Sequence, residues 1–182
     1  MEVFASQGYH AAAMDDIADR AGVSKPVLYQ HFPSKLDLYV ALLDTGSAEL
    51  IDKVRGALES TTDNRQRVTA AVEAYFAFVD DSAEAFRLLF ESDLFNEKKV
   101  RDRVQRTDDE CAELLVGVIS QDTGIDENEA TMLAFGLIGL AQTSARRWLR
   151  GDGRIPRDKA AWLVSRMGWR GISGFPRAGE SQ

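Results

Sequence analysis

Apolar residues recur at intervals of three and four positions along most of this 182-residue chain. This is the spacing of one face of an α-helix, whereas the strict alternation of apolar and polar residues that marks a half-buried strand is scarce. Only four prolines interrupt the pattern, and 45% of the residues are hydrophobic, which is enough for a sizeable core. The sequence therefore predicts an all-α protein.

Turn and capping residues divide this helical pattern. The first predicted helix is short and ends at Gly8, and the others are expected at about 14–21, 24–32, 34–57, 64–80, 82–92, 97–121, 127–150 and 156–168. Ser34 and Asp37 have the spacing of a capping box at the start of the 34–57 helix. The short helices predict a small module over residues 1–46, and the longer ones predict a helical bundle over residues 47–182.

The stretch AGVSKPVLYQHFPSK, residues 21–35, is the densest in turn and cap residues. Gly22 separates two short helices, which is the helix-turn-helix arrangement, whose second helix enters the major groove of DNA. Ser24 is the expected N-cap of that second helix and Pro33 its terminator, while Leu28 and Phe32 are expected to anchor it. The surface of this helix offers Ser24, Lys25, Val27, Tyr29, Gln30 and His31.

The same region resembles the N-terminal signature of the tetracycline-repressor (TetR) family. The matching segments are Gly8-Tyr9, Asp16-Ile17-Ala18, Ala21-Gly22-Val23-Ser24-Lys25, Leu28-Tyr29, His31-Phe32 and Ser34-Lys35-Leu36. The resemblance implies a dimeric transcriptional regulator, usually a repressor, that binds a palindromic double-stranded DNA operator. It also implies that the C-terminal domain binds a small-molecule effector, which releases the DNA.

Individual DNA-contact roles also follow from the resemblance. Groove contacts are implied for Ser24, Lys25, Val27 and Gln30, and phosphate contacts for Tyr29, His31 and Lys35. Lys25 is the best candidate for donating to guanine O6 or N7.

Three features depart from the family pattern. Ala12 and Ala13 stand where the family usually has Thr or Ser before the second helix. Asp15 puts a carboxylate where it would either repel phosphate or accept a hydrogen bond from a cytosine amine. The first helix is shorter than is usual, so either the numbered chain starts downstream of the true start or the helix is reduced.

Aromatic residues gather in the middle of the chain, where an effector pocket needs an apolar lining. The predicted pocket residues are Phe76, Phe86, Phe90, Cys111, Leu115 and Phe135, with plain core packing as the alternative for the aromatics. Cys111 lies on an apolar stripe and is expected to behave as a small buried hydrophobe.

The segment Ala134–Ala141 is apolar nearly all round, so a helix there must be buried on more than one side. Its glycines permit close approach of another helix, and together with the last helix it predicts the two-fold interface of a homodimer. The predicted interface residues are Gly136, Gly139, Leu140, Ala161 and Val164. An internal core helix is the alternative.

Composition and charge exclude several classes of protein. The net charge of −7 argues against bulk coating of nucleic acid, although a DNA-reading face needs only a few donors. No apolar run is long enough for a membrane span, the Met1 end does not resemble a secretory signal, and the single cysteine fits a reducing, cytoplasmic setting. Nine Lys or Arg lie from Arg146 to Arg177 against two Asp, which indicates either a solvated basic face or a surface for phosphates or acids.

Catalytic and metal-binding motifs are not recognisable. Both histidines, His10 and His31, lie in the N-terminal module, and no Gly-rich phosphate loop, zinc-ligand spacing or nucleophile elbow occurs. The sequence predicts a regulator that is not an enzyme and has no catalytic site, metal or cofactor. A dimeric ligand-binding protein that has lost DNA recognition is the competing interpretation, suggested by Ala13 and Asp15.

Overall fold

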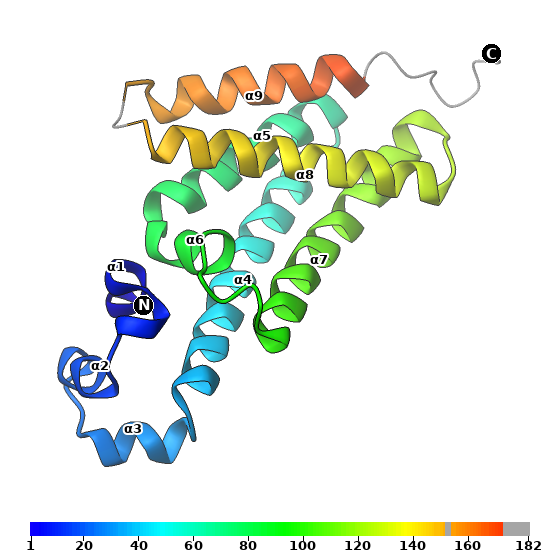
Figure 1. Cartoon of the computed structure of the whole chain (residues 1–182). Helices are drawn as coiled ribbons and strands as arrows, with labels where there is room; N and C mark the ends of the chain where they lie inside the picture. The colour runs from blue at the N-terminus through cyan, green and yellow to red at the C-terminus, as the bar shows by residue number, and fades with distance from the viewer. Residues whose placement is uncertain (152–153, 173–182) are drawn as a thin grey trace. The chain divides into compact units, whose positions relative to one another are not determined.

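A computed structural model describes residues 1–151 and 154–172 of the chain (Figure 1). These residues form nine α-helices and no strand, which confirms the predicted all-α fold. The helices are α1 (Glu2–Ala11), α2 (Met14–Ala21), α3 (Lys25–His31), α4 (Lys35–Glu59), α5 (Asn64–Asp81), α6 (Ala83–Phe90), α7 (Lys98–Thr123), α8 (Glu127–Leu149) and α9 (Arg157–Ile172). None of the helices in these ranges is long and apolar enough to cross a membrane.

The helix ends agree with the sequence to within a few residues, with two informative differences. Gly8 has a φ of 77°, so it breaks the helical backbone as predicted, but a further turn follows it up to Ala11. The last helix runs to Ile172, four residues beyond the predicted end at 168. Asp152, Gly153 and residues 173–182, which include Arg177 of the basic C-terminal segment, lie outside the described residues.

The chain divides into two compact units that are not contiguous in sequence. One unit consists of Met1–Ala48 together with Ser82–Arg106, and the other consists of Glu49–Asp81 together with the described residues from Thr107 onwards. The first unit thus adds α6 and the start of α7 to the predicted 1–46 module. Helices α4 and α7 contribute residues to both units.

An aromatic cluster holds the first unit together. Phe4 of α1 stacks on Tyr9 at 5.9 Å between ring centroids and meets the edge of Tyr39 of α4 at 5.1 Å. The Tyr39 hydroxyl donates to Ser92 Oγ at 2.7 Å. Edge-to-face and stacked pairs of this kind add to the stabilisation from buried area, so α1 is fixed to α4 by side chains far apart in sequence.

Helix α4 begins with the predicted capping arrangement. Ser34 Oγ accepts from the Asp37 backbone N–H at 3.1 Å and donates to the Asp37 carboxylate at 2.7 Å. This hydrogen bond and the Lys99 ammonium lower the pKa of Asp37. The capping residues therefore fix where the helix-turn-helix ends and the long helix starts.

Helices α5, α8 and α9 pack against one another in the second unit (Figure 1). At Gly168 of α9, an added Cβ would lie 3.1 Å from Leu137 Cδ2 of α8 and 3.9 Å from Val68 Cγ1 of α5. An added side chain would crowd Leu137, whereas the distance to Val68 is an ordinary contact, so α9 packs closely against α8 at Gly168.

Candidate DNA-binding face and ligand-binding cavity

The turn between α2 and α3 is built on Gly22, whose φ of 68° suits glycine. The Val23 N–H donates to Ala18 O and the Gly22 N–H to Asp19 O, both at 3.1 Å. This pair of bonds is a Schellman motif, which satisfies the last carbonyls of α2 and turns the chain sharply. Leu28 of α3 is buried, as is Ala18 of α2, so α3 is anchored by its inner side as predicted.

All six predicted surface residues of α3 and its N-cap are exposed: Ser24, Lys25, Val27, Tyr29, Gln30 and His31. Val27 is 38% and Tyr29 42% exposed, so an apolar and an aromatic side chain are both accessible on this short helix. Ser24 occupies the predicted N-cap position, but its hydroxyl makes no capping hydrogen bond. That hydroxyl is therefore available to a partner outside the chain.

Lys25 is paired with Asp15 across the helix-turn-helix. Lys25 Nζ donates to Asp15 Oδ2 at 2.9 Å, and both side chains remain largely exposed. The hydrogen bond to this carboxylate raises the pKa of Lys25. Asp15 therefore has a third role that the sequence did not indicate, because it orients the lysine that is expected to read guanine.

Lys35 occupies a different environment from the other predicted DNA contacts. Its ammonium donates to Tyr9 O at 2.7 Å and to Ala12 O at 3.0 Å, with His10 O at 3.4 Å. It also lies 4.4 Å from the centroid of the Tyr9 ring. A phosphate contact would have to compete with all of these interactions, so the geometry favours a structural role in closing α1.

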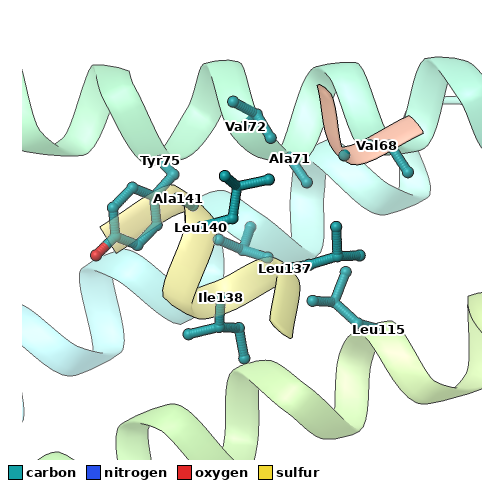
Figure 2. A pocket seen from close by; sticks show the side chains of 11 residues that line it. Val68, Ala71, Val72, Tyr75, Leu115, Leu137, Ile138, Leu140 and Ala141 are labelled. Carbon is teal, nitrogen blue, oxygen red and sulfur yellow. The ribbon is translucent and has the colours of Figure 1, made fainter. Parts of the chain in front are cut away.

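A cavity of about 60 Å³ lies inside the second unit (Figure 2). Its lining comes from five helices and is Val54, Val68, Ala71, Val72, Tyr75, Leu115, Leu137, Ile138, Leu140, Ala141 and Gly168. Figure 2 shows the α5 residues in a row, with Val68 at one end and Tyr75 at the other. Apart from the Tyr75 hydroxyl these side chains are apolar, so the cavity suits a hydrocarbon ligand.

Polar groups lie beside the Tyr75 end of the cavity. Gln142 Nε2 donates to Asp108 Oδ1 at 2.6 Å. Burial, Asp108 and Cys111 raise the pKa of Tyr75 well above its usual value, so its hydroxyl stays protonated. Burial also raises the pKa of Cys111 to about 12, which keeps it a thiol and fits its predicted role as a small hydrophobe.

Family models match both parts of the chain. The model described as "Bacterial regulatory proteins, tetR family" matches residues 1–42, and "Tetracyclin repressor-like, C-terminal domain" matches residues 64–171. The chain belongs to the TetR family of transcriptional regulators. The resemblance inferred from the helix-turn-helix residues is thereby confirmed.

Relatives of this TetR-family chain are regulators too. The HTH-type transcriptional activator FasR of Mycolicibacterium smegmatis is 47% identical over 175 residues, covering 96% of this chain and 80% of that protein. A TetR-like transcriptional regulator from Rhodococcus sp. RHA1 has a TM-score of 0.77 at 26% identity, covering 95% and 91%. FadR of Bacillus subtilis, solved in complex with stearoyl-CoA, has a TM-score of 0.76 at 17% identity, covering 96% and 94%, and shares the fold.

The structure brings only Leu115 of the predicted pocket residues into the cavity lining. Phe86 and Phe90 belong to α6 in the first unit, where their ring centroids lie 5.2 Å apart. Phe76 packs on Trp148 at 5.8 Å, and Phe135 is 37% exposed. Cys111 is buried but not part of the lining. The clustering of aromatics in sequence therefore mixed the cores of two units.

The lining residues that the predicted pocket missed lie mainly on α5 and α8. Val68, Ala71, Val72 and Tyr75 follow the spacing of one helix face, which was the available signal. Small aliphatic residues give a weaker signal than phenylalanine, because alanine and valine are equally common in filled cores.

Among the predicted interface residues, Gly136 and Gly139 are exposed, and Leu140 is partly exposed. Ala161 and Val164 are instead 1% and 8% exposed, because they face the chain's own helices, so they have little surface left for a partner. The exposed large apolar side chains on α9 are Trp162, Leu163 and Met167, and those on α8 are Met132 and Phe135. These residues are a better choice for the predicted interface.

Introducing a hydroxyl at Ala13 is expected to stabilise α2. Ala13 is its N-cap, with an extended backbone (φ −89°, ψ 145°) and no side-chain cap. The Ala13→Ser variant should gain about 1 kcal/mol in the free energy of unfolding, because serine caps orphan N–H groups. Urea unfolding would measure the gain, and the control is Ala11→Ser, an exposed position two residues earlier at the end of α1. An equal gain in both variants would contradict the capping explanation.

Asp108 is expected to destabilise the chain at neutral pH. Burial raises its pKa, so the folded chain holds the proton more tightly than the unfolded chain and stability falls as pH rises through the pKa of the folded state. Asp108→Asn should therefore be more stable than the native chain at pH 7, with the difference closing near pH ~4. Asp37→Asn should show the opposite sign, because its carboxyl has a lowered pKa. Urea midpoints at both pH values test the pair.

Proposed function

We propose that this regulator binds a palindromic operator as a homodimer, with α3 of each subunit in the major groove. The observation that carries the proposal is the exposure of Lys25, Val27 and Tyr29 on a short, well-anchored helix. Such a helix offers a donor, an apolar contact and a phosphate-binding hydroxyl to DNA. Two such helices in a dimer would read half-sites about 34–36 Å apart.

A dimer is supported by the apolar face on α8 and α9. Met132, Leu163 and Met167 are 77%, 46% and 57% exposed, and Gly136 and Gly139 have no neighbour within 4 Å of an added Cβ. A surface of this kind suits close packing against a second copy. Sedimentation of the native chain and of a Leu163→Glu, Met167→Glu variant tests it, because the variant should be monomeric.

We propose that the protein activates transcription when it is bound to DNA. The family resemblance had implied repression. FasR, 47% identical over nearly the whole chain, is called an activator. Deleting the gene should then lower transcription from promoters that the protein occupies. A rise in transcription on deletion would instead make the chain a repressor.

The effector that fits the cavity best is a fatty acyl chain. The lining is hydrocarbon except for one phenol, and FadR of Bacillus subtilis, which shares the fold, was solved with stearoyl-CoA. At about 60 Å³ the cavity is smaller than the roughly 300–1,000 Å³ typical of ligand sites. A long acyl chain must therefore move the lining helices apart as it enters.

A change in the width of the cavity can be transmitted to the DNA-binding helices by movement of α4. Val54 of α4 lines the cavity, while Leu38 and Tyr39 of the same helix are buried in the first unit. An effector that binds better to the widened form shifts the population toward that form. Couplings of this type are typically worth about 1–3 kcal/mol, or roughly 5–150-fold in DNA affinity.

DNA binding is tested by a mobility shift on the region upstream of the protein's own gene. Lys25→Ala and Tyr29→Ala should each weaken sequence-specific binding by about 10–100-fold, because each removes a contact worth about 1–3 kcal/mol. Lys98→Ala is the matched control, since Lys98 is also paired with an aspartate but lies on α7. A native dimer that forms no salt-sensitive specific complex would favour the competing ligand-binding protein.

A further inference from the structure

A groove of about 220 Å³ runs between α5 and α9 on the surface of the second unit. Three arginines line it, Arg65 from α5 with Arg166 and Arg170 from α9. Trp162 and Trp169 of α9 also line it, and Thr69 and Ser165 complete the lining. The lining therefore combines guanidinium groups, indole rings and hydroxyls and contains no carboxylate.

The basic side chains around Trp162 are ordered by the ring itself. Lys159 Nζ lies 4.1 Å and the Arg166 guanidinium carbon 4.9 Å from the centroid of the Trp162 ring. Cation–π contacts of this kind hold long basic side chains in place, so less entropy is lost when an anion binds. Basic side chains that are simply solvated do not require a tryptophan ring to order them.

Two arginines of the basic segment from Arg146 to Arg177, Arg166 and Arg170, line this groove. The chain as a whole carries a net charge of −7, so a cationic groove on its surface is a local departure from the overall balance. Arginine forks pair with phosphate oxygens in a bidentate manner, and indole rings stack on planar heterocycles. The two together suit a phosphorylated aromatic group, such as an adenine nucleotide.

The groove and the acyl cavity are neighbours on the same two helices. On α5, Val68 lines the cavity and Thr69 lines the groove, and on α9, Gly168 lines the cavity and Trp169 lines the groove. One ligand with an apolar tail and an anionic head could therefore use both sites.

We propose that this groove binds the phosphorylated adenine nucleotide of a fatty acyl-CoA whose acyl chain occupies the cavity. The inference rests on the proposed acyl effector and adds the head-group site to it. It explains why arginines and tryptophans share the α5–α9 surface. A phospholipid head group would offer phosphate without a ring to stack, so it would use only half of the groove.

The test measures binding of stearoyl-CoA, stearate and free CoA to the full chain by calorimetry. Arg166→Gln and Trp169→Leu should each weaken stearoyl-CoA binding by about tenfold, the worth of one charge-assisted or stacking contact. Binding of stearate should not change in either variant. Arg55→Gln is the matched control, because Arg55 is also exposed on this unit but pairs with Asp52 on α4.

The possible outcomes separate the head-group site from the effector class. Unchanged stearoyl-CoA affinity in both groove variants, with folding verified by thermal melts, overturns the head-group site and leaves the acyl effector standing. If the native chain binds neither stearate nor stearoyl-CoA, the acyl effector itself fails, and the head-group site falls with it. If phosphatidylglycerol vesicles bind the native chain through Arg166 as tightly as stearoyl-CoA does, the groove is a lipid-surface site, and the nucleotide assignment is wrong.

Discussion

Replacing Lys35 by methionine is expected to destabilise the first unit by about 2 kcal/mol, the cost of removing a charged donor from part-buried carbonyl acceptors. The native ammonium donates to the Tyr9 and Ala12 carbonyls at the end of α1, at 2.7 and 3.0 Å. Methionine keeps the length of the side chain and loses only these bonds and the contact with the Tyr9 ring. Those carbonyls are then left without their donor inside the unit.

The same variant distinguishes a structural role for Lys35 from a phosphate contact. A lysine that binds phosphate contributes about one unit to the slope of log affinity against log salt concentration. We expect Lys35→Met to leave that slope unchanged once the folded fraction is corrected for. Lys98→Met is the control for charge, because Lys98 is exposed and pairs with Asp102 on its own helix. A slope reduced by about one unit, with native stability, would restore the predicted phosphate role.

The contrast between Lys25 and Lys35 shows what the sequence can specify. Helix starts, stops and the turn at Gly22 depend on local backbone chemistry, so the helix-turn-helix and the exposed face of α3 could be predicted from neighbouring residues. Lys35 meets carbonyls 23 to 26 residues earlier in the chain. That partnership depends on how α1 packs on α4, which no local pattern encodes.

The candidate ligand cavity was harder to predict because it depends on which helix faces meet. Phe86 and Phe90 are as apolar as any lining residue, yet they fill the core of the first unit. The cavity instead lies where Val68, Ala71 and Val72 leave space between α5 and its neighbours. Space inside a core is set by packing, and small side chains leave more of it than large ones.

Filling that space at Ala71 is expected to make the regulator insensitive to its effector. The Ala71 side chain points into the cavity from α5 (Figure 2), and leucine there would occupy room that the acyl chain needs. Excluding three methylene groups of the ligand loses about 2.4 kcal/mol, which is roughly fifty-fold in affinity. DNA binding should stay at the native level, since Ala71 lies outside the first unit.

The adjacent Ala70→Leu change is the matched control, because Ala70 is on the same helix but lines a surface hollow with Thr69 and Glu73 instead of the cavity. Titrating stearoyl-CoA against a fixed protein–operator complex compares the two variants. If Ala71→Leu responds at the native effector concentration, the acyl chain does not enter this cavity. If both variants lose the response equally, the loss reflects damage to α5 rather than blocked entry. The two variants differ by one position on one helix, so a response lost only in Ala71→Leu, with native thermal stability, indicates a ligand inside the cavity.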